Sequence, residues 1–177
     1  FTGLSGAWSA AITEEPAKLI ALILLTRGGG KYPYILNGLL LGAAIGCSFS
    51  AFESVQFALD PRFEINIIFL RALLAPFMHI VWTALAGAAL WRVQRGGEFR
   101  FALIQKMEFL VPFGIVVLLH MIWNSFAYAL LPDFKYGGNI LLGVIAWIMV
   151  LIFVNLGVQQ IANEQKGKEV FATRDQI

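Results

Sequence analysis

Seven polar residues lie inside long apolar stretches of this 177-residue chain, where a lipid bilayer would exclude most polar side chains. A charged group at the centre of a membrane-spanning helix costs about 2.5 to 3.5 kcal/mol on insertion scales, so such residues normally face the interior of a helix bundle and have a function. They are Glu14 and Glu15 (the acidic pair), Lys18, Glu53, Asn124, and both histidines of the chain, His79 and His120. We treat these seven as candidate site residues.

The spacing of these residues places several of them on common helix faces. Glu14 and Lys18 are four residues apart, as are His120 and Asn124, so each pair lies on one face of its helix. Lys18 either neutralises the acidic pair or takes part in the chemistry, and Asn124 has an interhelical hydrogen bond as its simpler interpretation. Pro16 lacks a backbone N–H, which predicts that the acidic pair sits at a break where a half-helix begins.

Two histidines and one carboxylate form a ligand set that suits zinc and leaves a fourth coordination position for water. Glu53, His79 and His120 are on separate predicted helices, so they could surround a divalent metal, with one member of the acidic pair as general base. The HExxH spacing of soluble metalloproteases is absent. In a metal-free alternative, the acidic pair activates water directly, while a histidine and Asn124 stabilise the oxyanion.

The composition is that of an integral membrane protein, with 59% hydrophobic and 14% charged residues, against about 25% charged residues in soluble domains. The apolar stretches require about five spans of about 20 residues each. We expect an all-α, polytopic transmembrane helical bundle, with a helical domain at residues 1–160 and a polar, partly disordered cytoplasmic tail at residues 161–177. The predicted spans are Leu4–Leu25, Ile35–Leu59, Ile65–Trp91, Phe109–Leu131 and Ile140–Val158.

The basic residues are distributed unequally between the two sides of the predicted membrane. Nine fall on one side: Arg27, Lys31, Arg92, Arg95, Arg100, Lys106, Lys166, Lys168 and Arg174. The other side has Arg62, Lys135 and, near a span, Arg71. The positive-inside rule then predicts a multi-pass protein of the cytoplasmic membrane with a cytoplasmic C-terminus. The dispersed net charge of +2 does not favour nucleic acid as a partner.

Small residues recur every four positions in the second predicted span, at Gly38, Gly42, Gly46, Ser50 and Ser54. Such a ridge predicts close packing of another helix, with homo-oligomerisation through the same ridge as the alternative. The numbered chain opens on Phe1 and runs directly into an apolar stretch, so we expect a fragment of a longer precursor that lacks upstream helices.

Four short patterns follow one another on separate apolar spans. They are EEPAK at residues 14–18, FSAFE at 49–53, Arg71 with Pro76, His79 and Gly87, and HMIWN at 120–124. These patterns resemble the EExxK motif, the FxxxE motif, the third motif and the HxxxN motif of the PrsW family of intramembrane proteases. The resemblance covers about residues 8 to 130, in family order.

This resemblance implies a helical-bundle fold and hydrolysis of a peptide bond in a membrane-anchored protein near its extracytoplasmic side, with anti-sigma factors as the substrate class. It implies that the acidic pair activates water, that Glu53 and His120 surround that water or a metal, that Asn124 contacts the oxyanion, and that His79 is the third-motif histidine. Lys18 and Arg71 would support the site, Arg71 as an interface anchor or as a partner of Glu64. The related CAAX prenyl proteases carry histidine where this chain has Glu53, which disfavours prenylated substrates.

Two other classes of function stay open. Membrane Glu and His residues also form proton or cation relays, so a proton- or cation-coupled transporter is the main alternative, although no inverted repeat is evident. A catalytically silent binding or scaffold protein is the third class. The sequence therefore predicts an intramembrane endopeptidase in the lipid bilayer, using water activated by zinc or by glutamate.

Overall fold

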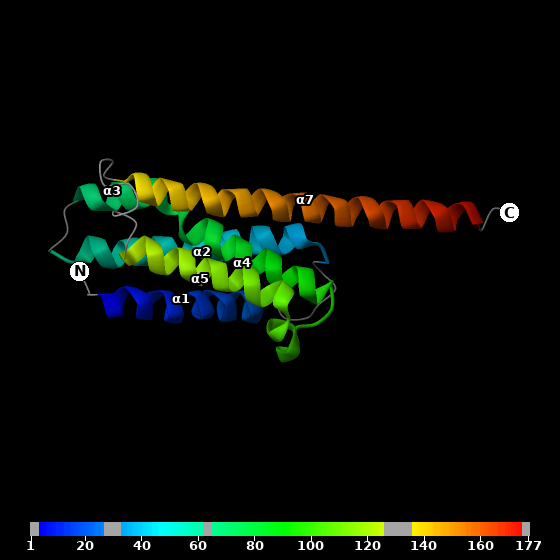
Figure 1. Cartoon of the computed structure of the whole chain (residues 1–177), viewed down its shortest axis with the longest axis horizontal. Helices are drawn as coiled ribbons and strands as arrows, with labels where there is room; N and C mark the ends of the chain where they lie inside the picture. The colour runs from blue at the N-terminus through cyan, green and yellow to red at the C-terminus, as the bar shows by residue number, and fades with distance from the viewer. Residues whose placement is uncertain (1–3, 27–32, 62–64, 126–135, 175–177) are drawn as a thin grey trace.

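The computed structural model describes residues 4–26, 33–61, 65–125 and 136–174, and none of these residues is in a strand (Figure 1). The prediction of an all-α helical bundle is confirmed. In chain order the elements are α1 (Leu4–Leu25), α2 (Ile35–Leu59), α3 (Ile65–Leu74), the 3₁₀ turn η1 (Ala75–Phe77), α4 (His79–Gln94), the 3₁₀ turn η2 (Phe101–Gln105), α5 (Met107–Ser125) and α7 (Gly137–Arg174).

Most of the helices are long and apolar enough to cross a membrane. By length and composition, four stretches in the described ranges qualify: Ile35–Leu59, Ile68–Gln94, Met107–Ser125 and Gly137–Gly167. α1 is of similar length, but Glu14, Glu15 and Lys18 lie within it. α1 and α2 begin and end at the residues predicted from the sequence.

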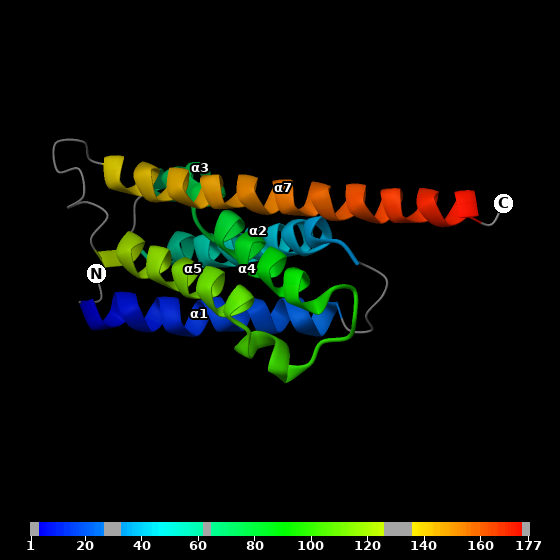
Figure 2. The same cartoon turned by 45° about the vertical axis from the view of Figure 1, so that its right-hand side comes forward.

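α4 is the central helix of the bundle. It contacts α2, α5, α7 and α1, and every residue from Val81 to Trp91 is buried. Figures 1 and 2 show α1 and α7 on opposite sides of the bundle, with α2, α4 and α5 between them. A side chain that projects from the first turn of α4 is therefore enclosed by helices on several sides.

The predicted small-residue ridge of α2 packs against α4 within the same chain. Gly38, Gly42, Gly46 and Ser50 are all buried. A Cβ atom at Gly42 would meet the backbone carbonyl of Thr83, and one at Gly46 would meet that of His79. The missing side chains thus let the two backbones approach closely, which sets the position of His79 relative to α2.

Gly46→Ala should destabilise the protein by about 1 to 3 kcal/mol, because the added methyl group collides with rigid backbone. Gly114→Ala is the matched control, since a Cβ there meets no atom within 4 Å, and it should be neutral or stabilising by up to about 1 kcal/mol. Thermal unfolding in detergent compares the two variants. Equal losses of stability in both would contradict the close contact between α2 and α4.

The helix break lies in the third predicted span and not in the first. α3 ends at Leu74, Met78 has φ −128° and ψ −111°, and α4 begins at His79. Pro76 lies within this break and cannot donate a helical hydrogen bond. The predicted break at Pro16 is wrong: α1 continues through Pro16, because a membrane helix packed on its neighbours tolerates the loss of one hydrogen bond.

The structure describes much of residues 161–177, the predicted polar and partly disordered tail, as helix. α7 continues to Arg174, well past the end of the apolar stretch (Figure 1). Its polar part contains strong helix formers such as Glu164, Gln165 and Lys166 and no proline. These propensities favour continuing the helix once its apolar part is packed.

Candidate active site

Polar side chains from four helices meet in the middle of the bundle. Each of them contacts at least one other member within 4 Å. The cluster consists of Glu14, Glu15 and Lys18 from α1, Glu53 from α2, His79 from α4 and His120 from α5. The structure thus brings together six of the seven candidate residues.

Lys18 and Glu15, both on α1, form a buried ion pair within this cluster. Nζ of Lys18 lies 2.6 Å from Oε1 of Glu15, and both side chains are 1% exposed. The same Nζ lies 3.7 Å from Oε2 of Glu14 and 4.1 Å from the centroid of the Phe49 ring. A positive charge is therefore held among the carboxylates of α1, which offsets the cost of burying them.

His79 is held through both of its ring nitrogens. Nδ1 lies 2.8 Å from Nζ of Lys18, and Nε2 lies 2.8 Å from Oε2 of Glu53. Because an ammonium group only donates hydrogen bonds, Nδ1 is the acceptor and Nε2 carries the hydrogen that faces Glu53. Helices α1 and α2 therefore set the tautomer and position of a histidine that belongs to α4.

His120 is held through one nitrogen and presents the other to Glu14. Nδ1 lies 2.8 Å from Oε1 of Glu15, while Nε2 lies 3.8 Å from Oε2 of Glu14. A carboxylate that accepts the Nδ1 hydrogen leaves the lone pair on Nε2. Carboxylates commonly orient metal-binding histidines in this way.

The donor set fits a small divalent cation. Glu14, His79 and His120 each offer one ligand atom, and these atoms lie within 4.8 Å of one another. Oε2 of Glu14 is buried and has no hydrogen-bond partner within the described part of the chain. Imidazole nitrogen and carboxylate oxygen are ligands that zinc prefers. These three residues could hold a metal ion, whereas the set predicted from the sequence contains Glu53 in place of Glu14.

One predicted site residue, Asn124, is not part of this cluster in the structure. Asn124 lies one turn beyond His120 in α5, and its side chain is exposed. Arg71 belongs to α3, but its side chain lies outside the described part of the structure, as does Glu64. The oxyanion role of Asn124 and the anchoring role of Arg71 stay predictions.

One comparison with known proteins identifies the family of the chain. A model of the PrsW family, described as intramembrane metalloproteases, matches residues 2–165. The chain belongs to the PrsW family. No curated protein and no solved structure matches the chain.

Membership of the PrsW family makes this chain an intramembrane protease, as the sequence predicted. The family description as metalloproteases also makes a divalent metal plausible at Glu14, His79 and His120. In this PrsW-family chain, four helices build the polar cluster, because α1, α2, α4 and α5 each contribute at least one side chain.

Sequence reasoning missed one residue that lines this cluster. Trp82 lies three residues after His79 in α4, and its ring contacts the rings of both histidines. A tryptophan in an apolar span is usually a core or interface residue, so its type alone gave no signal. The spacing of three residues from His79 was the available signal, because such residues share a helix face.

Proposed function

We propose that this chain is an endopeptidase that hydrolyses a peptide bond in a membrane-anchored protein, with a substrate of the anti-sigma-factor class. The observation that carries the proposal is Oε2 of Glu14, which is buried beside two histidines on other helices and accepts no hydrogen bond from the described residues. A buried carboxylate oxygen without a partner destabilises a fold unless it binds a ligand or takes part in chemistry.

We assign the metal-binding roles to Glu14, to His120 through Nε2, and to His79 through Nδ1, whose lone pair would exchange the hydrogen bond from Lys18 for the metal. When bound, a divalent metal such as zinc would supply Lewis-acid polarisation of the peptide carbonyl and of water. Glu15 would hold His120 through Nδ1, and Lys18 would keep Glu15 ionised and in place. We therefore propose that Glu15 orients His120 and is not itself a ligand. Its Oε1 already contacts both Nζ of Lys18 and Nδ1 of His120.

We assign the general base to Glu53, whose side chain is 20% exposed and lies outside the proposed ligand set. Its carboxylate would take a proton as the water oxygen attacks the carbonyl carbon. It would then return that proton to the leaving amine nitrogen as the C–N bond breaks, which yields a carboxylic acid and an amine. Glu53 is also 2.8 Å from Nε2 of His79, so the base and the histidine would orient each other.

The topology supports a site that is reached from the extracytoplasmic side. α1, α4 and α7 end at the same end of the bundle, where α5 begins (Figure 1). The polar segments around these ends carry most of the Lys and Arg residues. By the positive-inside rule this end is cytoplasmic, so the break around Pro76 in the third span lies toward the extracytoplasmic side.

A paired substitution tests the roles of the two carboxylates. Glu14→Gln should weaken Zn²⁺ binding by at least about 100-fold and abolish cleavage, because it removes a ligand. Glu53→Gln should lower cleavage by about 10²- to 10⁴-fold, because it removes the base. Zn²⁺ binding should weaken by only about 10-fold, because Glu53 also orients His79. Purified protein in nanodiscs is assayed against single-span substrates, with metal content measured in the same samples.

Glu108→Gln is the control, since Glu108 is an exposed residue at the start of α5. It should leave both cleavage and metal content unchanged. The proposal fails if wild type cuts no single-span substrate. Ion flux into liposomes that Glu53→Gln abolishes, without any cleavage, would instead establish the transporter alternative.

A further inference from the structure

Trp82 packs against both histidines of the site, whose own rings meet in an edge contact at 5.3 Å and 79°. Its ring is stacked on His120, with ring centroids 4.7 Å apart and an interplanar angle of 29°. It meets His79 in an edge contact, at 5.4 Å and 83°. A third contact, at 5.7 Å and 84°, joins it to Trp123 of α5. One side chain thus contacts both imidazoles and a further aromatic residue of α5.

Packing alone does not account for an indole at this position. Trp82 is 0% exposed, and its Nε1–H has no acceptor within the described part of the chain. Burying an unpaired donor destabilises a fold, and a phenylalanine would fill much of the same space without a donor. A six-membered ring, however, has less surface with which to contact two imidazoles at once.

The hydrogen bonds of the site leave the orientation of His120 incompletely determined. Its Nδ1 bonds to Glu15, but a single hydrogen bond still allows the ring to tilt about that nitrogen. A second ring stacked on its face removes this freedom, because tilting would break the stacking contact. The ring of His79 contacts Phe49 of α2, with ring centroids 5.2 Å apart, and it contacts Trp82 on its own helix.

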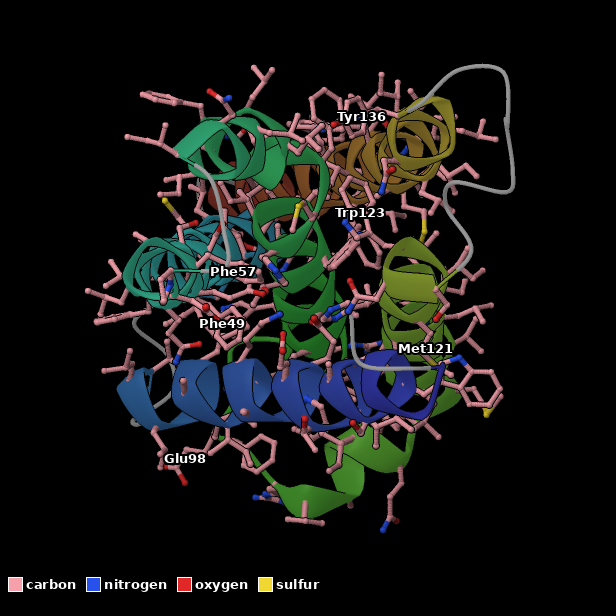
Figure 3. All side chains as sticks on the ribbon, turned by 90° about the vertical axis from the view of Figure 1, so that its left-hand side faces the viewer. Phe49, Phe57, Glu98, Met121, Trp123 and Tyr136 are labelled. Carbon is pink, nitrogen blue, oxygen red and sulfur yellow. The ribbon has the colours of Figure 1, made fainter. Side chains whose placement is uncertain are left out.

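Figure 3 shows Phe49 of α2 and Trp123 of α5 on either side of α4, which carries His79 and Trp82. The two labelled rings come from different helices and flank the aromatic contacts of the site. The imidazoles are thus enclosed by aromatic rings, in addition to their bonds to charged groups. Trp82 is the member of this enclosure that contacts both histidines.

We propose that Trp82 is a positioning residue that fixes the ring planes of His79 and His120, so that both imidazoles keep their ligand nitrogens near Glu14. The geometric part of this proposal concerns the chain itself. Only its consequence for metal affinity rests on the proposed function.

The presence of only two histidines makes a direct test practical. Protein labelled with ¹³C and ¹⁵N in histidine gives two ring spin systems by NMR in detergent micelles, without metal or substrate. The variants are Trp82→Phe, Trp82→Leu and the control Trp91→Leu. Trp91 is a buried tryptophan of the same helix, nine residues beyond Trp82.

In wild type we expect one sharp set of signals for each ring, with the His120 ring protons shifted upfield by the stacked indole. Trp82→Leu should remove that shift and give broadened or multiple signals for both rings. Trp82→Phe should restore part of the shift, because a phenyl ring can still stack. Trp91→Leu should leave both rings as in wild type, even where its melting temperature falls as far as that of Trp82→Leu.

Zn²⁺ titration of the same four proteins gives the second readout. Trp82→Leu should bind Zn²⁺ at least about 10-fold more weakly than wild type, Trp82→Phe should be intermediate, and Trp91→Leu should match wild type. The proposal is overturned if the histidine signals of Trp82→Leu differ from wild type no more than those of Trp91→Leu. If wild type binds no Zn²⁺, the proposed metal site fails, while the NMR comparison still decides the role of Trp82.

Discussion

His120→Ala is expected to lower peptide cleavage by at least about 10³-fold and to release the metal, because it removes a proposed ligand. Glu15→Gln should have a smaller effect, about 10- to 100-fold on metal affinity, since Glu15 only orients His120 through Nδ1 at 2.8 Å. Cleavage kinetics and metal analysis of purified protein measure both effects. We expect His120→Ala to lose more metal and more activity than Glu15→Gln does.

Leu118→Ala in α5 is a suitable control for these variants, because Leu118 is exposed on the same helix, two residues before His120. It should retain metal and activity. If Glu15→Gln releases metal as completely as His120→Ala does, then Glu15 is itself a ligand and its assignment as an orienting group is wrong.

Lys18→Met is expected to destabilise the protein by about 3 to 5 kcal/mol, because it leaves the buried carboxylate of Glu15 without its partner at 2.6 Å. The double variant Glu15→Gln with Lys18→Met should regain much of this stability, since both buried charges are then removed together. Thermal unfolding in detergent, analysed as a double-mutant cycle with Glu15→Gln alone, gives the coupling between the two residues.

This cycle also separates the two roles that Lys18 could have. If Lys18 acts as a counter-ion, the stability of the double variant returns toward that of wild type, and the coupling energy is large. If Lys18→Met is as stable as wild type while cleavage is lost, the lysine acts in the chemistry and the counter-ion role is ruled out.

The candidate residues could be found from the sequence because charged groups are costly at membrane depth. Glu14, Lys18 and His120 stand out against apolar neighbours for this reason, and their spacing predicts which of them share a helix face. Asn124 stood out in the same way, yet its side chain is exposed in the structure. Polarity at membrane depth thus selects candidates, but it does not show which way a helix is rotated.

The choice between carboxylates could not be made from the sequence. Glu14, Glu15 and Glu53 carry the same chemical group, and the predicted zinc set used Glu53. In the structure Glu15 lies 2.6 Å from Lys18, and Glu53 lies 2.8 Å from His79. Glu14 lies 3.7 Å from Lys18 and 3.8 Å from His120. Differences of about an ångström between helices distinguish the three carboxylates.

The sequence by itself determined the all-α membrane bundle, because a bilayer leaves helices as one of very few ways to satisfy the backbone. It also determined the extents of α1 and α2 and the family. Only the tertiary structure decided that the break lies around Pro76, that Trp82 contacts both histidines, and which nitrogen of each imidazole faces which carboxylate. These features depend on how α4 is placed against its neighbours. That placement comes from close backbone contacts such as Gly46 against His79, which act between segments far apart in the chain.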